Sequence, residues 1–334
     1  MWPASQQWYA IQNYLSDSSS RNTIATSRRR RLLLRYQLHY QSELKALHRP
    51  MILAKEFSRS AVARQSDFST SSNERGIFLL QERSSKRKRL VRGSLIAQFA
   101  ANEATSFADA AELIWPHIDG IDLNCGCPQP WAYKERIGSF LLRQPDTVRD
   151  IINTTRDRVG QNFPISIKIR VDSDLKRTDQ LIQTAIHAGA SHISVHGRTR
   201  HQPSTAPVSL DSISFAVEST KGAVPIVANG DAWSFVESED IRKTTGVQGV
   251  MSARGLLANP AMFAGYDRAP IEAIKEFVWL STSYGLSFGL FHRHLQYMLE
   301  GRLAKQERAV FTQLPSLAST IDYLESLGMD FGVQ

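Results

Sequence analysis

Apolar residues follow two alternating patterns from residue 94 onwards. Short apolar runs of strand length recur, and helical segments whose apolar positions repeat every three to four residues separate many of them. The runs that predict strands are residues 95–100, 119–125, 164–171, 191–197, 224–230 and 246–255. The segments that predict helices include residues 103–115, 146–159, 177–190 and 231–245. This alternation predicts βα units that build a parallel sheet.

Six such units in succession favour a (β/α)8 TIM barrel over an open sheet, provided that residues before 94 supply two more strands. The segment PMILAKEF at 50–57 is a candidate for one of them. We therefore predict an α/β fold with a barrel over residues 50–262, in which the first strand is missing or replaced. The strand pattern stops after residue 260, and helical patterns follow at 271–285, 288–303 and 316–328. Residues 263–334 are thus expected to form a small C-terminal helical domain.

The N-terminal part lacks a clean hydrophobic period. Residues 1–49 are expected to be disordered or atypical, and SDSSSRNTIATSRRRR at 16–31 carries most of this character. Its serine and arginine content is also typical of a transit peptide, so a mitochondrial location stays open beside the cytoplasm or nucleus. Residues 76–93 are polar and charged without a core face, which predicts a basic insertion in the barrel domain.

Composition and charge narrow the class of protein. The chain has 334 residues, a formal net charge of +8 and 42% hydrophobic residues, which suffices for a sizeable core. Residues 1–93 hold 18 Lys and Arg against 6 Asp and Glu, whereas the remainder holds 22 against 26, so the positive excess is N-terminal. Such basic clusters bind phosphates or form a solvated tail, and charge alone does not choose between these. The sequence contains no apolar run of about 18 residues, so it does not predict a membrane span.

The two cysteines of the chain occur together in GIDLNCGCPQPWA, residues 120–132. A bridge between Cys125 and Cys127 would be badly strained, and no nearby His or Cys completes a zinc site, so no metal is expected. A buried inert thiol is one interpretation of either residue. Cys127, however, follows the strand into a loop, and a thiol with an ordinary pKa of about 8.5 is protonated at neutral pH. It could therefore act as a general acid beside a hydride donor.

Polar residues stand at the carboxyl ends of six consecutive strands. In a parallel barrel these ends converge on one face, where active sites form. Each residue alone is compatible with a structural role, but the series indicates a functional site. The residues are Gln98, Asn124, Lys168, Arg170, His196, Asn229 and Arg254.

The last two units add glycine-containing turns, ANGDAW at 228–233 and SARGLLANP at 252–260. Glycines let backbone N–H groups approach a phosphate, and barrels commonly build a phosphate site from their last two loops. Arg254 would add a charge-assisted contact. The chain has neither GxGxxG nor a Walker sequence, so FMN is favoured over a dinucleotide held by a Rossmann fold.

Several motifs, in their order and spacing, resemble the tRNA-dihydrouridine synthases. They are DLNCGCPQPWA, KIRV, VHGRTR, VANGD and SARGLLANP. The cysteine loop and PAMFAGYD at 260–267 are most similar to the eukaryotic branch that acts on D-loop uridines 20a and 20b. The resemblance covers about residues 50–72 and 94–330. It implies a flavoprotein barrel that contains FMN and a C-terminal helical domain that helps hold tRNA. It further implies that NADPH or NADH serves as reductant and that uridine is reduced to 5,6-dihydrouridine.

The resemblance also implies roles for individual residues. Cys127 would protonate C5 of the uracil ring. Substrate contacts would come from Asn124, Arg170 and Arg198. The residues implied to bind the cofactor are Gln98, Lys168, His196, Asn229, Gly230, Asp231, Ala253 and Arg254.

Two departures from the family pattern keep alternatives open. The family's first strand, with its Ala-Pro-Met-type flavin contact, is not found; only residues 50–68 match the segment after that strand, and residues 76–93 interrupt a short join. A tRNA-binding pseudoenzyme is therefore one alternative. A flavin barrel that reduces a small pyrimidine is another, although the helical C-terminal segment and the arginines at 198 and 200 favour tRNA. The sequence leaves open the uridine modified, the choice between NADPH and NADH, and the oligomeric state.

Overall fold

A computed structural model describes residues 9–13, 46–48, 51–67, 78–81, 88–91, 94–283 and 285–331. Its centre is a run of six hydrogen-bonded parallel strands, ordered along the sheet as along the chain. They are β6 (Ser94–Ala100), β7 (Gly120–Cys125), β8 (Ile165–Arg170), β9 (Ile193–His196), β10 (Ile226–Asn229) and β11 (Gly249–Ser252). Each lies within a run predicted from the sequence or overlaps it closely. The predicted α/β barrel is confirmed.

The barrel closes through two strands from the N-terminal segment. Strand β1 (Tyr9–Asn13) pairs antiparallel with β11, and also antiparallel with β2 (Ala46–His48). Strand β2 then pairs in parallel with β6. The expectation that residues 1–49 stay outside the barrel therefore differs from the structure at these eight residues. Without them, β6 and β11 would expose unpaired N–H and C=O groups, which is unfavourable at a sheet edge. An antiparallel strand thus occupies the place of the parallel first strand that the sequence lacks.

The segment 50–57, a candidate strand from the sequence, is extended only at residues 52–53 and is helical from residue 54 onwards. Only β3 (Ile52–Leu53) pairs with β6, through Phe99 and Ala100, further along the same edge that β2 uses. Helix α2 (Ala54–Arg59) begins directly after it and is followed by α3 (Ala61–Asp67). The apolar residue Phe57 faces the core, where its ring packs edge-on against Phe99 with 5.2 Å between centroids. Burial of one face of a short helix accounts for the apolar pattern that suggested a strand.

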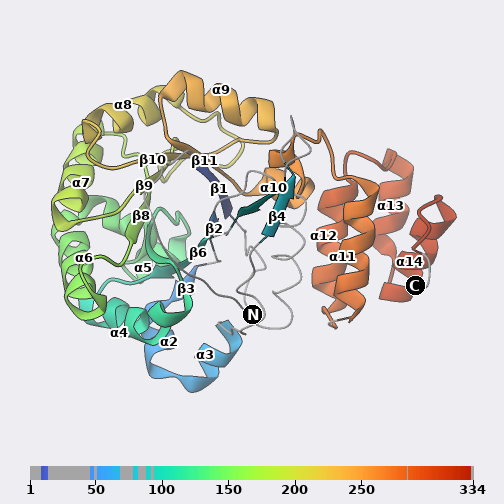
Figure 1. Cartoon of the computed structure of the whole chain (residues 1–334), viewed down its shortest axis with the longest axis horizontal. Coiled ribbons are helices and arrows are strands. Elements are labelled where there is room, and N and C mark those ends of the chain that lie inside the picture. Colours follow the sequence, from blue (N-terminus) through green and yellow to red (C-terminus); the bar gives the residue numbers. More distant parts are fainter. Residues whose placement is uncertain are drawn as a thin grey trace.

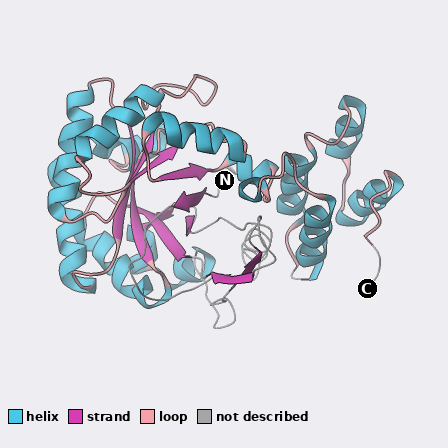
Figure 2. Cartoon of the chain, turned by 45° about the horizontal axis from the view of Figure 1, so that its top comes forward, coloured by secondary structure: helices cyan, strands magenta, loops and turns pink. Residues whose placement is uncertain are grey.

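Helices surround the strands on the outside (Figures 1 and 2). The largest are α4 (Ala104–Ile114), α6 (Pro145–Val159), α7 (Leu175–Ala188), α8 (Leu210–Thr220) and α9 (Phe235–Thr245). All four predicted helices are confirmed, whereas α8 was not assigned from the sequence. The main core contains the buried faces of these helices and the strand residues that meet them. Short elements at the strand ends are η2 (Trp115–His117), α5 (Pro130–Lys134), η3 (Gly138–Arg143), α10 (Arg254–Ala258) and η4 (Met262–Ala264).

The described parts of the expected insertion 76–93 form a small sheet of their own. Strand β4 (Phe78–Gln81) pairs antiparallel with β5 (Lys88–Val91), and neither joins the barrel sheet. Figure 2 shows this pair apart from the barrel strands. Over the described ranges, no helix is both long and apolar enough to cross a membrane.

The C-terminal segment is helical and has a separate core. Its helices are α11 (Ile271–Ser283), α12 (Phe288–Leu299), α13 (Lys305–Gln313) and α14 (Leu317–Ser326). They pack around aromatic side chains that include Phe277, Phe291 and Phe311, all almost fully buried. In Figure 1 they lie to one side of the barrel, next to α10. Helix α13 carries one fully buried apolar side chain, Phe311, which explains why no helical pattern is visible there in the sequence.

Candidate active site

The carboxyl ends of the parallel strands open into a cavity of about 1230 Å³. This is the end at which barrels gather functional groups. All twelve residues that the sequence singled out line it, although they come from six different strands and the loops after them. They are Gln98, Asn124, Cys127, Lys168, Arg170, His196, Arg198, Asn229, Gly230, Asp231, Ala253 and Arg254.

The loop after β7 holds Cys127 from both sides. The side-chain oxygen of Asn124 accepts hydrogen bonds from the backbone N–H groups of Gly126 (3.0 Å) and Cys127 (2.9 Å). The carbonyl of Cys127 in turn accepts the N–H of Ser139 at 2.9 Å. Gly138 has a left-handed φ of 63°, and a Cβ there would lie 2.8 Å from both the Cβ and the carbonyl oxygen of Cys127. The loop therefore fits tightly around this cysteine.

The two thiols have different surroundings. Cys125 is completely buried in β7, and burial raises its pKa well above the ordinary value. Cys127 is partly buried and lines the cavity. Burial also raises its pKa, against the opposing effect of the positive charges of Lys168 and Arg170. Cys127 therefore carries its proton at neutral pH, and two nearby cations favour the thiolate that remains once that proton is given away.

A hydrogen-bonded chain runs through the barrel interior to this loop. Asp122 accepts bonds from Ser166 Oγ (2.6 Å) and Gln98 Nε2 (2.7 Å), and Gln98 Oε1 accepts one from Asn124 Nδ2 (2.8 Å). Gln98 and Asn124 were expected from the sequence, whereas Asp122 and Ser166 were missed. A carboxylate in the middle of an apolar strand, DLNC, was the available signal for Asp122.

Asp122 and Lys168 are buried ionisable groups in the same part of the barrel. Burial raises the pKa of Asp122 to about 6, although bonds from Ser166 and Gln98 oppose the shift. Burial lowers the pKa of Lys168 to about 8, although the charge of Asp122 opposes that change. Each group therefore favours the charged form of the other, and near pH 7 both are charged.

His196, at the end of β9, is held as a neutral ring. Its Nδ1 accepts the backbone N–H of Arg198 at 3.2 Å. Burial, reinforced by the positive charges of Lys168 and Arg170, lowers the pKa of His196 to about 2. The ring is therefore neutral at physiological pH, and its single proton is on Nε2. This gives the cavity a hydrogen-bond donor without a charge.

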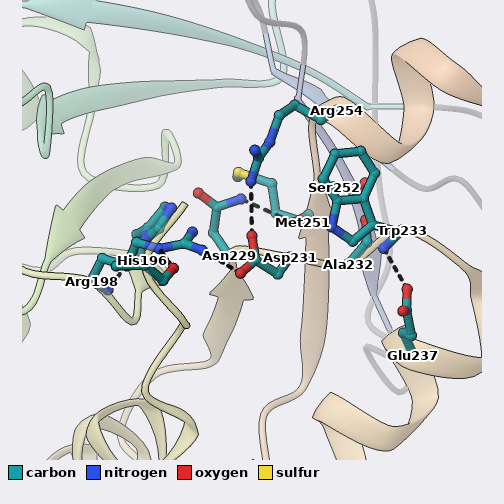
Figure 3. A network of polar contacts seen from close by, with 11 residues as sticks. His196, Arg198, Asn229, Asp231, Ala232, Trp233, Glu237, Met251, Ser252 and Arg254 are labelled. Atoms are coloured by element: carbon teal, nitrogen blue, oxygen red, sulfur yellow. Dashed lines mark hydrogen bonds and ion pairs between the residues drawn. The ribbon is translucent and has the colours of Figure 1, made fainter. Parts of the chain in front are cut away.

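An aspartate bridges two arginines at the ends of β9, β10 and β11 (Figure 3). Asp231 pairs through one oxygen with Arg198, and through the other with Arg254 at 2.8 Å. Arg198 is only 2% exposed and also donates to the carbonyl of Ala206. Arg254 lies over the ring of Trp233, 4.7 Å from its centroid. Two arginines against one carboxylate leave this corner with a net positive charge.

Arg198 lines the cavity as expected, but its side chain is almost fully enclosed. The sequence motif grouped it with residues that contact substrate, but its guanidinium is buried against Asp231 and the loop before α8. The preceding residue, Gly197, is closely packed, since a Cβ there would lie 2.6 Å from the carbonyl oxygen of Ser209. We therefore place Arg198 with the residues of the Asp231 corner.

The positive corner also offers polar atoms and space for an anionic group. Asn229 donates to the carbonyl of Met251 (3.0 Å), while its buried Oδ1 has no hydrogen-bond partner. Gly230 has a φ of 122°, and a Cβ there would lie 2.7 Å from Val208 Cγ2, so the turn that forms this corner requires glycine. The first N–H groups of α10, at Arg254 and Gly255, point out of the helix start, where such groups lack helical partners. These features fit the phosphate and polar edges of a flavin mononucleotide.

The opposite rim of the cavity carries further positive charge. Arg170 donates to the carbonyls of Thr199 (2.8 Å) and Gln202 (3.3 Å), which ties β8 to the loop after β9. Arg200 stacks over the ring of Tyr133 with 3.5 Å to its centroid. Among the described residues, no group of three or more His, Cys, Asp or Glu is arranged to hold a metal ion. The groups that the cavity offers include a protonated thiol at Cys127, a neutral imidazole at His196 and a positively charged corner at Asp231.

Comparison with known proteins agrees with this arrangement. Residues 26–325 match the family model described as dihydrouridine synthase (Dus). A human protein named tRNA-dihydrouridine(20a/20b) synthase [NAD(P)+]-like is 43% identical over 279 residues, which cover 82% of this chain and 80% of that protein. The Schizosaccharomyces pombe tRNA-dihydrouridine(20a/20b) synthase [NAD(P)+] is 41% identical over a match that covers 84% of this chain and 79% of that protein. The Saccharomyces cerevisiae protein of that name is 34% identical over 290 residues. This chain belongs to the dihydrouridine synthase family.

Proposed function

We propose that this chain reduces a uridine of tRNA to 5,6-dihydrouridine, at position 20a or 20b as in the names of its relatives. The single observation that carries the proposal is the position of Cys127. Its protonated thiol lies on the wall of a cavity whose far corner is built for an anion. A flavin-dependent reduction needs a group that donates the proton and a site that holds the phosphate of the cofactor, and this cavity offers both.

The anion corner fits FMN, with Asn229, Gly230, Asp231, Ala253 and Arg254 at its phosphate end. Gln98, Lys168 and His196 would hold the polar edges of the flavin ring, because they line the same cavity. When bound, and after reduction by NADPH or NADH, this cofactor supplies the hydride that C6 of uracil receives. The neutral Nε2–H of His196 contributes a hydrogen bond there without adding positive charge.

Cys127 supplies the other hydrogen. Its S–H bond breaks as the proton moves to C5 of uracil, so that the ring gains one hydride and one proton across the former double bond. Lys168 and Arg170 stabilise the resulting thiolate by their charge, and water returns the proton afterwards. Asn124 bonds to the backbone of Cys127 and Arg170 lines the same cavity, which supports a role for both in orienting the uracil ring.

The target base must leave its stack to enter the cavity, as for other enzymes that modify bases. Arg200, stacked on Tyr133 at the cavity rim, offers a charge for the phosphates that flank such a base. We further propose that residues 263–334, which form their own helical core, provide an additional surface for tRNA. A tRNA substrate implies an intracellular location, which cell fractionation would assign to cytoplasm, nucleus or mitochondria.

The test uses purified protein, NADPH and an unmodified tRNA transcript. We expect yellow protein, oxidation of NADPH and a nucleoside 2 Da heavier than uridine by mass spectrometry. A matched transcript that lacks uridine at 20a and 20b should yield no product. A colourless protein that still binds tRNA would instead identify a pseudoenzyme. A yellow protein that reduces free uracil but not tRNA would identify a reductase of small pyrimidines.

A further inference from the structure

The chain of hydrogen bonds from Asp122 to Cys127 has a direction that is fixed at both of its ends. At one end, the ionised carboxylate of Asp122 can only accept. At the other end, the backbone N–H groups of Gly126 and Cys127 can only donate. Between them stand two side-chain amides, Gln98 and Asn124, each with one donating and one accepting side. Only one orientation of each amide satisfies every link.

Strand register places these groups side by side in the barrel. Gln98 of β6 lies opposite Asp122 of β7, and Asp122 lies opposite Ser166 of β8. Asn124 is two residues beyond Asp122 and so points to the same face of the sheet. Gln98, Asp122 and Ser166 are each no more than 1% exposed, which limits access of water to their side chains. A donor or acceptor left unpaired here bears its full desolvation cost.

We propose that Asp122 is a positioning residue for Cys127. By accepting from Gln98, it sets the direction of both amides, and the Asn124 oxygen then holds the N–H groups at the start of the cysteine loop. Asp122 itself is three hydrogen bonds away from that loop and lies outside the set of residues that line the cavity. An effect of Asp122 on catalysis rests on the proposed function. The coupling between Asp122 and the cysteine loop does not, because it involves only groups of the protein.

The direction of the chain can be reversed by exchanging two residues. Asn124→Asp keeps an acceptor for the loop N–H groups, but then two carboxylates flank Gln98, whose single amide group can donate toward only one of them. Adding Asp122→Asn restores a donor at the far end. The introduced asparagine accepts from Ser166 and donates to Gln98, and Gln98 donates to the carboxylate now at 124. That carboxylate lies opposite Lys168, which compensates its charge. Every link of the chain is then satisfied again.

The experiment measures the cysteine loop without substrate. Backbone amide exchange of Gly126 and of Cys127 is recorded, as two separate readouts, for the purified protein and three variants. Asn124→Asp should accelerate both by about tenfold or more, since a buried pairing is lost. Asp122→Asn alone should change them little. The introduced amide nitrogen can donate to Ser166 Oγ, so that the amide oxygen still accepts from Gln98. The double variant Asp122→Asn/Asn124→Asp should return both to within about threefold of wild type.

Ser194→Ala is the matched control, because this buried hydroxyl of β9 lies opposite Lys168 in the same sheet but takes no part in the chain of bonds. It should leave the exchange of Gly126 and Cys127 unchanged. If Asn124→Asp does not fold, folding of the double variant alone supports the proposal. A double variant that exchanges as fast as Asn124→Asp, or that also fails to fold, overturns it. Neither readout involves tRNA, so failure of the proposed reaction leaves this test intact.

Discussion

Asp231 and Arg198 form an ion pair in which the arginine is 2% exposed while the aspartate adopts a left-handed φ of 53°. A non-glycine residue in this region costs free energy, and it persists where its surroundings hold it. Here two arginines hold it, since the second carboxylate oxygen receives Arg254. The turn after β10 is thus shaped by charge, and the same charges prepare the corner for an anion.

Asp231→Asn should destabilise the protein. Asparagine tolerates the left-handed backbone, so the change removes the charge and little else. Arg198 then keeps a buried charge without its counterion, which we expect to lower the free energy of unfolding by about 3 kcal/mol. Urea unfolding measures this. Asp146→Asn is the control, because Asp146 is 80% exposed in its pair with Arg149 and should change stability by less than about 0.5 kcal/mol. Equal effects of the two substitutions would contradict the assignment.

Gly138→Ala should disturb the cysteine loop more than its backbone conformation alone explains. Gly138 and Gly285 have similar φ values, 63° and 67°, but a Cβ at 138 meets Cys127 at 2.8 Å whereas one at 285 meets nothing within 4 Å. Gly285→Ala should therefore cost about 1 kcal/mol, the left-handed penalty only. Gly138→Ala should cost about 1–3 kcal/mol more, as overpacking does. Chemical denaturation of both variants gives the difference, and equal losses would show that the loop yields freely.

Much of the barrel could be predicted because its strands are local patterns. The apolar runs that contain Gln98, Asn124 and Asn229 carry their own period and a polar group at or near their carboxyl ends, so each βα unit can be recognised by itself. Parallel topology then places those ends together without further information. This is why residues distant in sequence were correctly expected on one face.

Features that depend on contacts between distant segments could not be read this way. Tyr9–Asn13 pairs with β11, which would otherwise be an open edge of the sheet. The sequence of these five residues does not predict that pairing. The contacts of Arg198 could not be predicted from its position after His196, because Asp231 and Ala206 set the direction of its side chain. Asp122 was missed because a single carboxylate within a strand does not indicate a role by itself. Its role can be inferred only from its hydrogen bonds with Gln98 and Ser166.

Stability should fall in acid through Asp172, which ties the loop after β8 to η3. Arg143 donates two bonds to its carboxylate, at 2.8 and 3.0 Å, and these hold the pKa of Asp172 at about 2. Because the pKa in the folded state is depressed below the unfolded value of 3.8, the contribution is complete above about pH 5. It is lost as pH falls from about 4 toward 2. Since Arg143 is 51% exposed, solvent screening leaves about 1–2 kcal/mol.

Urea unfolding at pH 6 and pH 3 tests this in wild type and Asp172→Asn. The wild type should exceed the variant in stability at pH 6 and approach it at pH 3, so the difference between them shrinks in acid. Asp122 has the opposite sign, because its raised pKa of about 6 makes its ionisation unfavourable to folding as pH rises above 4. Both proteins retain Asp122, so its effect cancels. A constant difference at the two pH values would contradict the role of Asp172.

Cys127→Ala and Cys125→Ala should separate proton donation from packing. Cys127 borders the cavity, so its loss should leave flavin binding and reduction by NADPH intact while dihydrouridine formation falls by about a hundredfold or more. Cys125 is fully buried in β7, so its loss opens a small void and should lower stability by about 1 kcal/mol, without changing activity per folded protein. Product is measured by nucleoside mass spectrometry and flavin reduction by bleaching of its visible absorbance under anaerobic conditions. Both variants lose the same sulfur atom, so any difference between them in activity comes from the position of the thiol. Full product formation by Cys127→Ala would require another acid in the cavity, and Lys168, whose pKa is lowered to about 8, would then be the group to replace next.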